Sequence, residues 1–546
     1  MKILFTGLFL IATVGAYSQN QLSRVSGNIE SNFQLLNEDT LIGAFAPTEK
    51  SVINSFMNLN YEMGRIKAGV RFESYLPSIA GYPNFYSGTG LGYRYAQYNG
   101  DDLTVKLGNF YEQFGSGMIL RAFEESALGL DNAFDGININ FSPRAGVELK
   151  GLVGRQRYNF KDGTIEKAPG IVRGIDGNIQ INQLIPAFST ADFKIDIGGS
   201  YVSRFQDTPD TTPENVNSYA GRLAMYYKRF YLNAEYVHKN PDPGLGNGQS
   251  YNTGHGALVN MGYSQKGLGI ILTARSVNNM VYRSNKKLLG NQAWINYLPA
   301  ISNNHTYNLA GSLYPYAANV GGEIAYQLDV LYKIPKKTRL GGKYGTDLHM
   351  NVSVATDYVR HTTGVNTAET GVRFIARPFD MRDSLYNFDF NFHVSRKFNK
   401  KLKASLHYYH FIFNNNVNPV TLLSKGYIKS DIGVIDVQYR INRKHSLRFE
   451  LQGLWTKKDR GNWASATVEY TISPAWFISL QDVYNYGNPD EALQLHYLLG
   501  SFGYTHKTAR FMFSYGKQRA GIVCIGGVCR PVPATNGLTF TFTQSF

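Results

Sequence analysis

The chain has 546 residues, of which 43% are hydrophobic, and its mean hydropathy is -0.27. After residue 19 no stretch approaches the ~18 consecutive apolar residues of a transmembrane helix, which excludes a helical membrane protein. The formal net charge of +15 fits anionic lipid headgroups, anionic solutes or acidic partners better than nucleic acid, given the export signal described next.

The first residues predict export. Lys2 precedes an apolar run from Ile3 to Val14, and small and polar residues follow, as in a secretory signal peptide. We therefore expect residues 1–18 to be a signal peptide and residues 19–546 to form a single β-barrel domain. An uncleaved anchor helix is the alternative, but ~12 apolar residues are too few to span a bilayer.

Segments of alternating polar and apolar residues begin near Leu22 and continue through the N-terminal side, joined by candidate tight turns. These turns lie near Glu62 to Arg65, Asn99 to Asp102, Ser142 to Ala145, Leu184 to Ala187, Lys228-Arg229 and Ser264 to Gly267, with a longer one near Ile334 to Arg339. Two long connections, Asn278 to Gly321 and Val359 to Leu385, are expected on the opposite side.

One charged segment loses the strand alternation and is too long for a turn. It carries Arg121, Glu124 and Glu125 and is followed by Asp131. If it folds inward, these side chains form a luminal charge cluster at a constriction that sorts solutes by charge. An ordinary external loop with solvated charges is the alternative, and the sequence leaves both open.

The C-terminal third shows the alternation most clearly. Apolar Tyr386, Phe388, Phe390, Phe392 and Val394 alternate with polar Asn387, Asp389, Asn391, His393 and Ser395. Further tight turns are predicted at Lys397 to Lys401, Asn442 to His445, Ser473 to Ala475 and Thr505 to Thr508, and longer polar connections lie between them. The polar positions Asn391, His393, Gln438 and Arg440 are expected to face a wet lumen.

About eleven tight turns, each joining two strands, plus a first and a last strand predict about 24 strands. Because boundaries are uncertain, we accept roughly 20 to 26. The fold class is therefore all-β, a transmembrane antiparallel outer-membrane β-barrel. Closure is required because an open sheet edge in hydrocarbon leaves backbone groups unpaired.

The last strand has one apolar face, formed by Leu538, Phe540, Phe542 and Phe546. This face and the final aromatic residue resemble the C-terminal signal that the barrel-assembly machinery reads in bacterial outer-membrane proteins. Gln544 departs from that pattern. An ordinary edge strand is the alternative.

The cysteines Cys524 and Cys529 lie in the last long connection, which the strand count places outside the cell. The two glycines between them allow a small ring, so we predict a structural disulfide that contributes roughly 2 kcal/mol at most. A redox-active pair is the alternative, but only Arg530 is a nearby cation.

Basic residues recur at the short turns. They are Lys228-Arg229, Lys336-Lys337, Lys397, Lys400-Lys401 and Arg443-Lys444. If the topology is right, they lie at one end of the barrel, where they bind anionic headgroups or an acidic periplasmic partner, or are simply solvated.

The stretches from Leu447 to Asp490, from Tyr515 to Phe546 and from Gly108 to Gly136 resemble a family of uncharacterised barrel proteins of Bacteroidota outer membranes. These stretches touch both ends of the chain and leave the middle unmatched. The resemblance implies the fold and a location in the outer membrane, and the family has no assigned activity to carry over.

No enzyme, cofactor or metal site is predicted. Gly88, Gly90 and Gly92 lack the helix of a dinucleotide fingerprint. His407 and His410 are three residues apart, so in a strand they point to opposite faces and cannot share a metal.

We predict a channel or transporter for small polar or anionic solutes, because a barrel of more than ~16 strands leaves an aqueous lumen or needs a plug. The alternative is an occluded barrel that serves as a scaffold in a larger surface or secretion assembly. The expected partners are outer-membrane lipid, the barrel-assembly machinery and a periplasmic or surface protein, and no nucleic acid.

Overall fold

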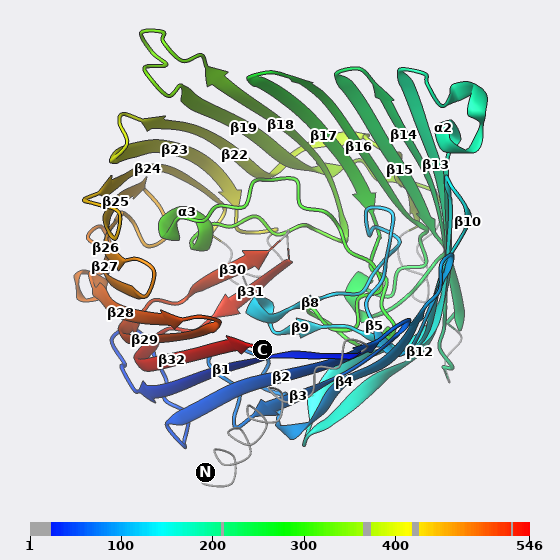
Figure 1. Ribbon diagram of the computed structural model, residues 1–546, viewed down its shortest axis with the longest axis horizontal. Coiled ribbons are helices and arrows are strands. Elements are labelled where there is room, and N and C mark those ends of the chain that lie inside the picture. Colours follow the sequence, from blue (N-terminus) through cyan, green and yellow to red (C-terminus); the bar gives the residue numbers. More distant parts are fainter. Residues whose placement is uncertain (1–22, 209–211, 364–372, 418–424, 526–527) are drawn as a thin grey trace.

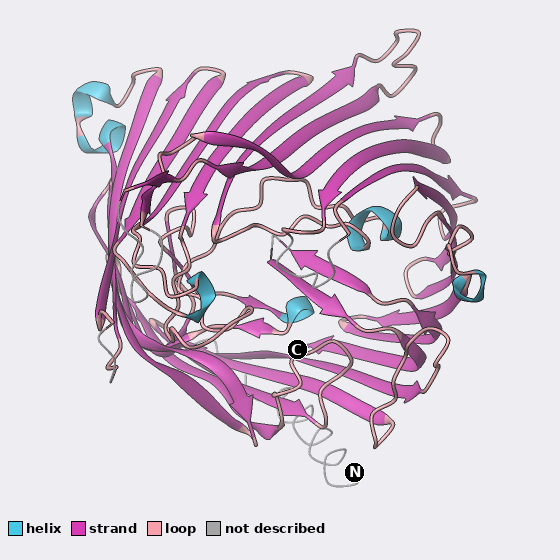
Figure 2. Cartoon of the chain, turned by 180° about the vertical axis from the view of Figure 1, so that it is seen from behind, coloured by secondary structure: helices cyan, strands magenta, loops and turns pink. Residues whose placement is uncertain are grey.

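The computed structural model describes residues 23–208, 212–363, 373–417, 425–525 and 528–546. The predicted signal peptide, residues 1–18, lies outside the described residues. Within them, 24 strands form one antiparallel sheet that closes on itself, with loops and short strands inside the ring (Figures 1 and 2).

The first half of the barrel runs from β1 to β16. Its strands are β1 (Ser23–Asn37), β2 (Ser51–Met63), β3 (Ile66–Tyr75), β4 (Gly88–Asn99), β5 (Leu103–Phe110), β10 (Phe134–Arg144), β11 (Val147–Lys161), β12 (Thr164–Gln180), β13 (Phe193–Phe205), β14 (Asn215–Tyr227), β15 (Phe230–Lys239) and β16 (Gly254–Gln265). Each pairs with the next, so chain order and spatial order agree.

The second half returns to β1. Its strands are β17 (Leu268–Asn278), β18 (Gly322–Ile334), β19 (Thr346–Tyr358), β22 (Met381–Lys397), β23 (Leu402–Asn414), β24 (Tyr427–Arg440), β25 (His445–Thr456), β26 (Trp463–Ile472), β27 (Trp476–Tyr484), β28 (His496–His506), β29 (Ala509–Gln518) and β32 (Thr535–Ser545).

Eight short strands stand apart from the barrel sheet in pairs. They are β6 (Gln113–Phe114) with β7 (Leu120–Arg121), β8 (Glu124–Glu125) with β9 (Leu130–Asp131), β20 (His361–Thr362) with β21 (Phe374–Ile375), and β30 (Gly521–Ile525) with β31 (Val528–Val532). The helical turns are α2 (Ile181–Leu184), α3 (Asn308–Ser312), η1 (Ser126–Leu128), η2 (Pro186–Phe188), η3 (Leu245–Asn247) and η4 (Glu491–Leu493). In the described ranges, none of the helices has the length and apolar character that a membrane crossing requires.

The barrel strands form because polar and apolar residues alternate along them. In β25, Leu451 points outward with 57% of its surface exposed, whereas its neighbour Gln452 points inward and is 5% exposed. Successive side chains of a strand point to opposite faces, so this alternation gives the wall one apolar and one polar side. The apolar side of this strand is the outer one.

The last strand closes the ring against the first. Leu538 and Phe540 of β32 lie opposite Leu35 and Phe33 of β1, and the backbones of Gly27 and Phe546 exchange two hydrogen bonds of 2.9 Å. Leu538, Phe540 and Phe542 therefore lie on the strand that seals the sheet, and Phe546 directly follows it. Their recognition by the assembly machinery stays a prediction.

The predicted strand number is confirmed, and each predicted tight turn falls between two consecutive barrel strands. The turn predicted at Leu184 to Ala187 is not tight, because that connection spans residues 181–192 and contains α2 and η2. Two details of the long connections differ from the prediction. The connection expected to run to Leu385 ends earlier, because β22 already begins at Met381. The connection between Asn278 and Gly322 has the expected bounds, but much of it lies inside the barrel, as described next.

Candidate luminal plug and vestibule

Three connections fold into the barrel, and together we call them the plug. Inner segment 1 is residues 111–133, between β5 and β10. Inner segment 2 is residues 279–321, between β17 and β18, and inner segment 3 is residues 519–525 and 528–534, between β29 and β32. All three lie inside the ring of strands in both ribbon views (Figures 1 and 2).

Inner segment 1 folds inward because its middle is apolar. Met118, Ile119 and Leu120 are fully buried in one hydrophobic cluster with Met280 and Ile295 of inner segment 2. Each strand from β12 to β19 adds one apolar side chain to this cluster, namely Val172, Val202, Val216, Val237, Leu258, Val277, Ala325 and Ala355. The long-loop half of the lumen is therefore a packed core against this part of the wall.

Inner segment 2 continues across the lumen to the opposite wall. Leu309 and Ala310 of α3 are buried in a second cluster with Phe411 of β23, Ile432 of β24 and Trp463 of β26. The same segment thus packs against both sides of the barrel. Apolar contacts at its two ends hold it in place.

The three inner segments also bind one another by hydrogen bonds. The backbone N–H of Arg121 donates to the carbonyl of Ile295 at 2.8 Å. In inner segment 3, Arg519 donates to the Ser312 hydroxyl at 2.6 Å, and Arg530 donates to the Ala127 carbonyl at 2.9 Å. The plug is therefore one connected unit rather than three independent loops.

A buried ionic network fastens inner segment 1 to the wall, and we call it the latch. It consists of Arg71 and Glu73 of β3, Arg157 of β11, Glu124 of β8 and Asp131 of β9. The Arg157 guanidinium donates to both carboxylate oxygens of Glu73, at 2.6 and 2.7 Å, and to Asp131 at 3.1 Å. Both side chains of the Arg157–Glu73 pair are 1% exposed.

Arg71 completes the latch. Its guanidinium donates to Glu73 at 2.8 Å and to Glu124 at 2.5 Å, and it also pairs with Asp131. Burial raises the pKa of the Glu124 carboxyl, against the opposing effect of the Arg71 guanidinium. Two cations therefore face three carboxyl groups in the latch.

The four residues of the predicted charge cluster separate into two groups. Glu124 and Asp131 come together in the latch, where their partners are wall arginines. Arg121 lies apart, with its guanidinium 4.1 Å from the ring centre of Tyr297 and 4.5 Å from that of Phe123. Glu125 also lies apart and accepts a hydrogen bond at 3.3 Å from the Ala127 N–H at the start of η1.

At the short-turn end the lumen is open and polar. A cavity of about 660 Å³, which we call the vestibule, is lined by strands β16 to β19 and β22 to β24 and by Tyr307 of inner segment 2. Its charged and polar lining residues include Lys333, Asp347, His349, His393, Lys403, His407, Asp436 and Gln438. The predicted lumen-facing residues His393 and Gln438 are among them, and Asn391 is fully buried.

Three histidines form a row across the vestibule wall. His349 lies opposite His393, and His393 lies opposite His407, with ring centres 5.3 and 4.4 Å apart. Tyr307 reaches the row, since its hydroxyl lies 3.0 Å from the Nε2 of His407. Inner segment 2 therefore forms the floor of the vestibule.

Single-strand spacing could not reveal this row, because its members come from β19, β22 and β23 and meet only through the register of the sheet. The predicted divergence of His407 and His410 does occur, since His407 lines the vestibule and His410 pairs with Asp431 at 2.8 Å. In the described ranges no group of three or more His, Cys, Asp and Glu side chains is arranged to hold a metal ion.

The predicted cysteine pair lies in inner segment 3. Cys524 and Cys529 are directly opposite each other in the hairpin of β30 and β31. The side chain of Cys524 lies outside the described residues, so the disulfide stays a prediction. The hairpin folds into the barrel, where the carbonyl of Cys529 accepts a hydrogen bond from Asn291 of inner segment 2 at 3.1 Å, and its position on the outer side of the membrane stays a prediction.

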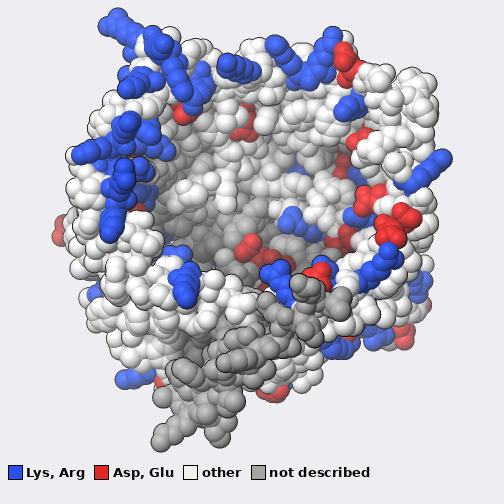
Figure 3. Space-filling model, viewed as in Figure 1, with Lys and Arg blue, Asp and Glu red and all other residues white. Residues whose placement is uncertain are grey.

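The basic short turns lie along one side of the barrel mouth. Figure 3 shows Lys and Arg side chains gathered at the left and top of the rim, over the turns that follow β18, β22 and β24, around a central hollow. These turns include Lys336-Lys337, Lys400-Lys401 and Arg443-Lys444. Their possible partners stay a prediction.

The whole chain matches one known protein family. The model described as "Family of unknown function (DUF6029)" matches residues 1–546. The chain belongs to this family. Its members share no assigned function, and the predicted Bacteroidota origin stays a prediction. No curated protein matches the chain.

Solved structures of low sequence identity also match. The P pilus usher (PapC) translocation pore is 8% identical with a TM-score of 0.41, over 96% of this chain and 99% of that chain. The siderophore receptor PirA from Pseudomonas aeruginosa is 9% identical with a TM-score of 0.40, over 96% and 80%. The outer membrane protein OpdK from Pseudomonas aeruginosa is 10% identical with a TM-score of 0.36, over 85% and 100%. Likenesses at this level say nothing about a solute or a partner.

Proposed function

We propose that the protein is an integral outer-membrane barrel that acts as a solute channel, with the plug as its constriction and the vestibule as its periplasmic entrance. The outer wall carries this proposal. Apolar side chains such as Leu451, Ile478 and Leu480 are about half exposed on the outside of the closed sheet. A soluble protein rarely leaves so extended an apolar surface in water, whereas a bilayer solvates it.

The lining of the vestibule favours small polar or anionic solutes as the cargo of the channel. Its lining contains Lys333, Lys403 and the histidine row, together with Asp347 and Asp436. Lys333 pairs with Asp347 at 2.5 Å, and Asp436 accepts from Arg448 at 2.9 Å. Because both carboxylates already have cationic partners, Lys403 gives the entrance a positive character.

A second candidate function is an occluded barrel that serves as a scaffold. The packed core of inner segments 1 and 2 favours it, because apolar side chains from both segments and from the wall fill part of the lumen. The two candidates differ in whether ions pass the plug of the intact protein.

Conductance in planar bilayers tests both. We compare the wild type with a variant in which residues 113–131 are replaced by a short Gly-Ser linker, and with Arg443→Gln/Lys444→Gln as a control outside the lumen. The channel predicts ohmic steps from the wild type, larger steps from the linker variant and unchanged steps from the control. A silent wild type with a conducting linker variant would favour the scaffold. Silence from all three would contradict a lumen that crosses the membrane.

A further inference from the structure

The outer wall carries a group of charged side chains on β4, β10, β11 and β12, and we call it the outer basic cluster. It consists of Arg94, Asp135, Arg155, Lys167 and Arg173. Arg155 and Arg173 are exposed on the same face as apolar neighbours two residues away along their strands, whereas the residues directly beside them in the chain are buried or point inward. The cluster therefore faces outward and is not part of the lumen.

The members of the cluster are close together. The Asp135 carboxylate lies 3.4 Å from the Arg94 guanidinium and also pairs with Lys167. Arg155 is directly opposite Asp135 in the sheet, and Arg173 is diagonal to Arg155 across β11 and β12. Cross-strand and diagonal neighbours have Cβ atoms roughly 5 to 8 Å apart. The cluster thus contains four cations and one carboxylate, so it has an excess of positive charge.

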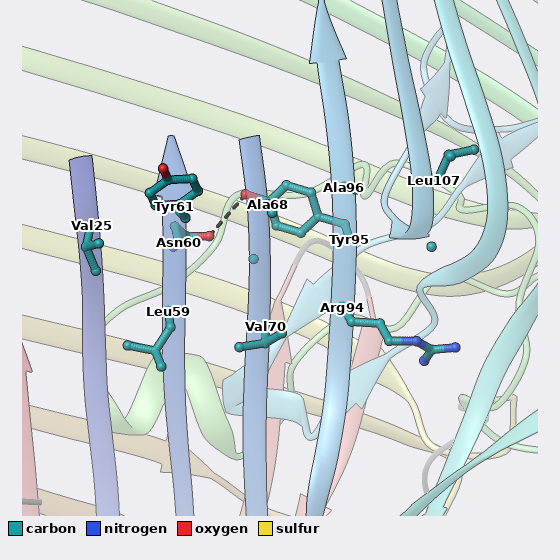
Figure 4. A pocket seen from close by; sticks show the side chains of 12 residues that line it. Val25, Leu59, Asn60, Tyr61, Ala68, Val70, Arg94, Tyr95, Ala96 and Leu107 are labelled. Carbon is teal, nitrogen blue, oxygen red and sulfur yellow. Dashed lines mark hydrogen bonds between the residues drawn. The ribbon is translucent and has the colours of Figure 1, made fainter. Parts of the chain in front are cut away.

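An apolar groove of about 520 Å³ lies beside the cluster on β1 to β5. Small residues, including Ala68, Gly69 and Ala96, leave the space, and Leu59 and Leu107 are among the apolar residues that border it. Arg94 also lines the groove, so its guanidinium connects groove and cluster. Figure 4 shows Leu59, Val70 and Arg94 at one level on three neighbouring strands.

The cluster lies away from the short turns. β4 runs toward the short turn at residues 100–102. Arg94 precedes Ala96 and Tyr98 on that strand, so it is farther from the turn than they are. Short turns of outer-membrane barrels are periplasmic, so this end of the groove faces the outer leaflet. A wall that faces lipid cannot carry excess positive charge without cost unless anions neutralise it.

We propose that the groove and the outer basic cluster bind a phosphorylated glycolipid of the outer leaflet, with an acyl chain in the groove and a phosphate group on Arg94, Arg155 and Arg173. Guanidinium groups bind phosphate through paired N–H donors, and the groove buries methylene groups at about 0.8 kcal/mol each. This inference rests on the proposed membrane location, since only a wall in a bilayer meets such a lipid.

Native mass spectrometry of the purified protein, reconstituted in phosphatidylcholine nanodiscs and titrated with hexa-acyl bisphosphoryl lipid A, tests the cluster. Arg155→Gln/Arg173→Gln removes two outward cations, and Arg443→Gln/Lys444→Gln removes the same charge at the short-turn rim. We expect the first variant to bind at least tenfold more weakly and the second to bind like the wild type. Equal losses in both variants, or no loss in the first, would overturn the proposal.

Two further measurements distinguish binding of the whole lipid from binding of its phosphate group alone. Ala96→Leu fills the groove, so we expect it to weaken lipid A binding severalfold while Arg155 and Arg173 remain. Inorganic phosphate should compete only weakly with lipid A, because it lacks the acyl chain. Full competition by phosphate, or unchanged lipid binding by Ala96→Leu, would contradict a lipid site. Failure of the wild type to reconstitute would instead contradict the membrane location itself.

Discussion

At the scale of single residues, Arg157 has the largest predicted effect on stability. Its guanidinium is the partner of the buried Glu73 carboxylate and also reaches Asp131 of the plug. Removing one partner of a buried ion pair leaves an uncompensated charge, so we expect Arg157→Ala to lower the free energy of unfolding by about 3–5 kcal/mol.

Urea unfolding in detergent micelles measures this change. Arg155→Ala is the matched control, because that side chain is two residues away and exposed on the outer wall. We expect the control to change stability by less than about 0.5 kcal/mol. Similar losses in the two variants would argue that the latch adds nothing specific.

Glu124 gives the latch a pH dependence. Because burial raises its folded pKa, its ionised form costs stability at a pH above that pKa, and this cost disappears as the pH falls through it. Glu124→Gln mimics the neutral form, so we expect a higher Tm than the wild type at pH 8 and a difference that shrinks toward acid pH. Asp131→Asn should lower the Tm at pH 8, since both latch arginines lose a charged partner. A Glu124→Gln effect that is independent of pH would contradict this account.

Residue-level prediction from sequence reached part of the site. Glu124 and Asp131 were singled out because their segment lacks strand alternation, and they do lie together. Arg71, Glu73 and Arg157 were missed, because the alternation does not reveal the register shifts beside Arg71 and Arg157, and only the closed barrel brings β3 and β11 near the same loop. Arg121 was expected with the carboxylates, but two aromatic rings surround it instead.

At the scale of elements, α3 anchors inner segment 2 to the far wall. Leu309 is fully buried against aromatic and aliphatic side chains of β23 to β26. Leu309→Ala removes buried methyl groups, which typically costs 2–5 kcal/mol. We expect amide hydrogen exchange in residues 308–312 to accelerate at least tenfold, while the amides of β15 and β16 keep their wild-type protection.

Exchange-detected mass spectrometry in micelles measures both regions. Equal acceleration in both would mean that α3 is not a separate anchor but part of one global unfolding unit. Unchanged exchange in residues 308–312 would mean that the apolar cluster does not hold the segment.

The barrel hairpins could be predicted because the alternation of polar and apolar residues is a local signal, and recognisable tight turns separate one strand from the next. The plug could not be predicted as well, because loop residues such as Met118 and Ile295 read as ordinary apolar residues until a lumen surrounds them. The apolar belt that receives them was missed for a related reason. Val202 and Val237 occupy inward positions, which the alternation predicts to be exposed to water. They are buried only because the inner segments contact them.

At the scale of the whole molecule, one structural claim supports both proposals. The 24 strands place alternate residues on an apolar outer wall and on an inner wall that surrounds the plug and the vestibule. Gln438 lines the vestibule, whereas Ile435 of the same strand points outward and is 46% exposed. The channel, the scaffold and the lipid site all depend on this division.

Labelling of single cysteines by a membrane-impermeant thiol reagent in proteoliposomes tests that division most directly. Gln438→Cys and Ile435→Cys are compared in a Cys524→Ser/Cys529→Ser background, with the reagent on both sides of the membrane. We expect Gln438→Cys to be modified and Ile435→Cys to be protected until detergent dissolves the bilayer and denaturant unfolds the barrel. Equal modification of the two cysteines in intact liposomes, or modification of Ile435→Cys alone, would contradict the account.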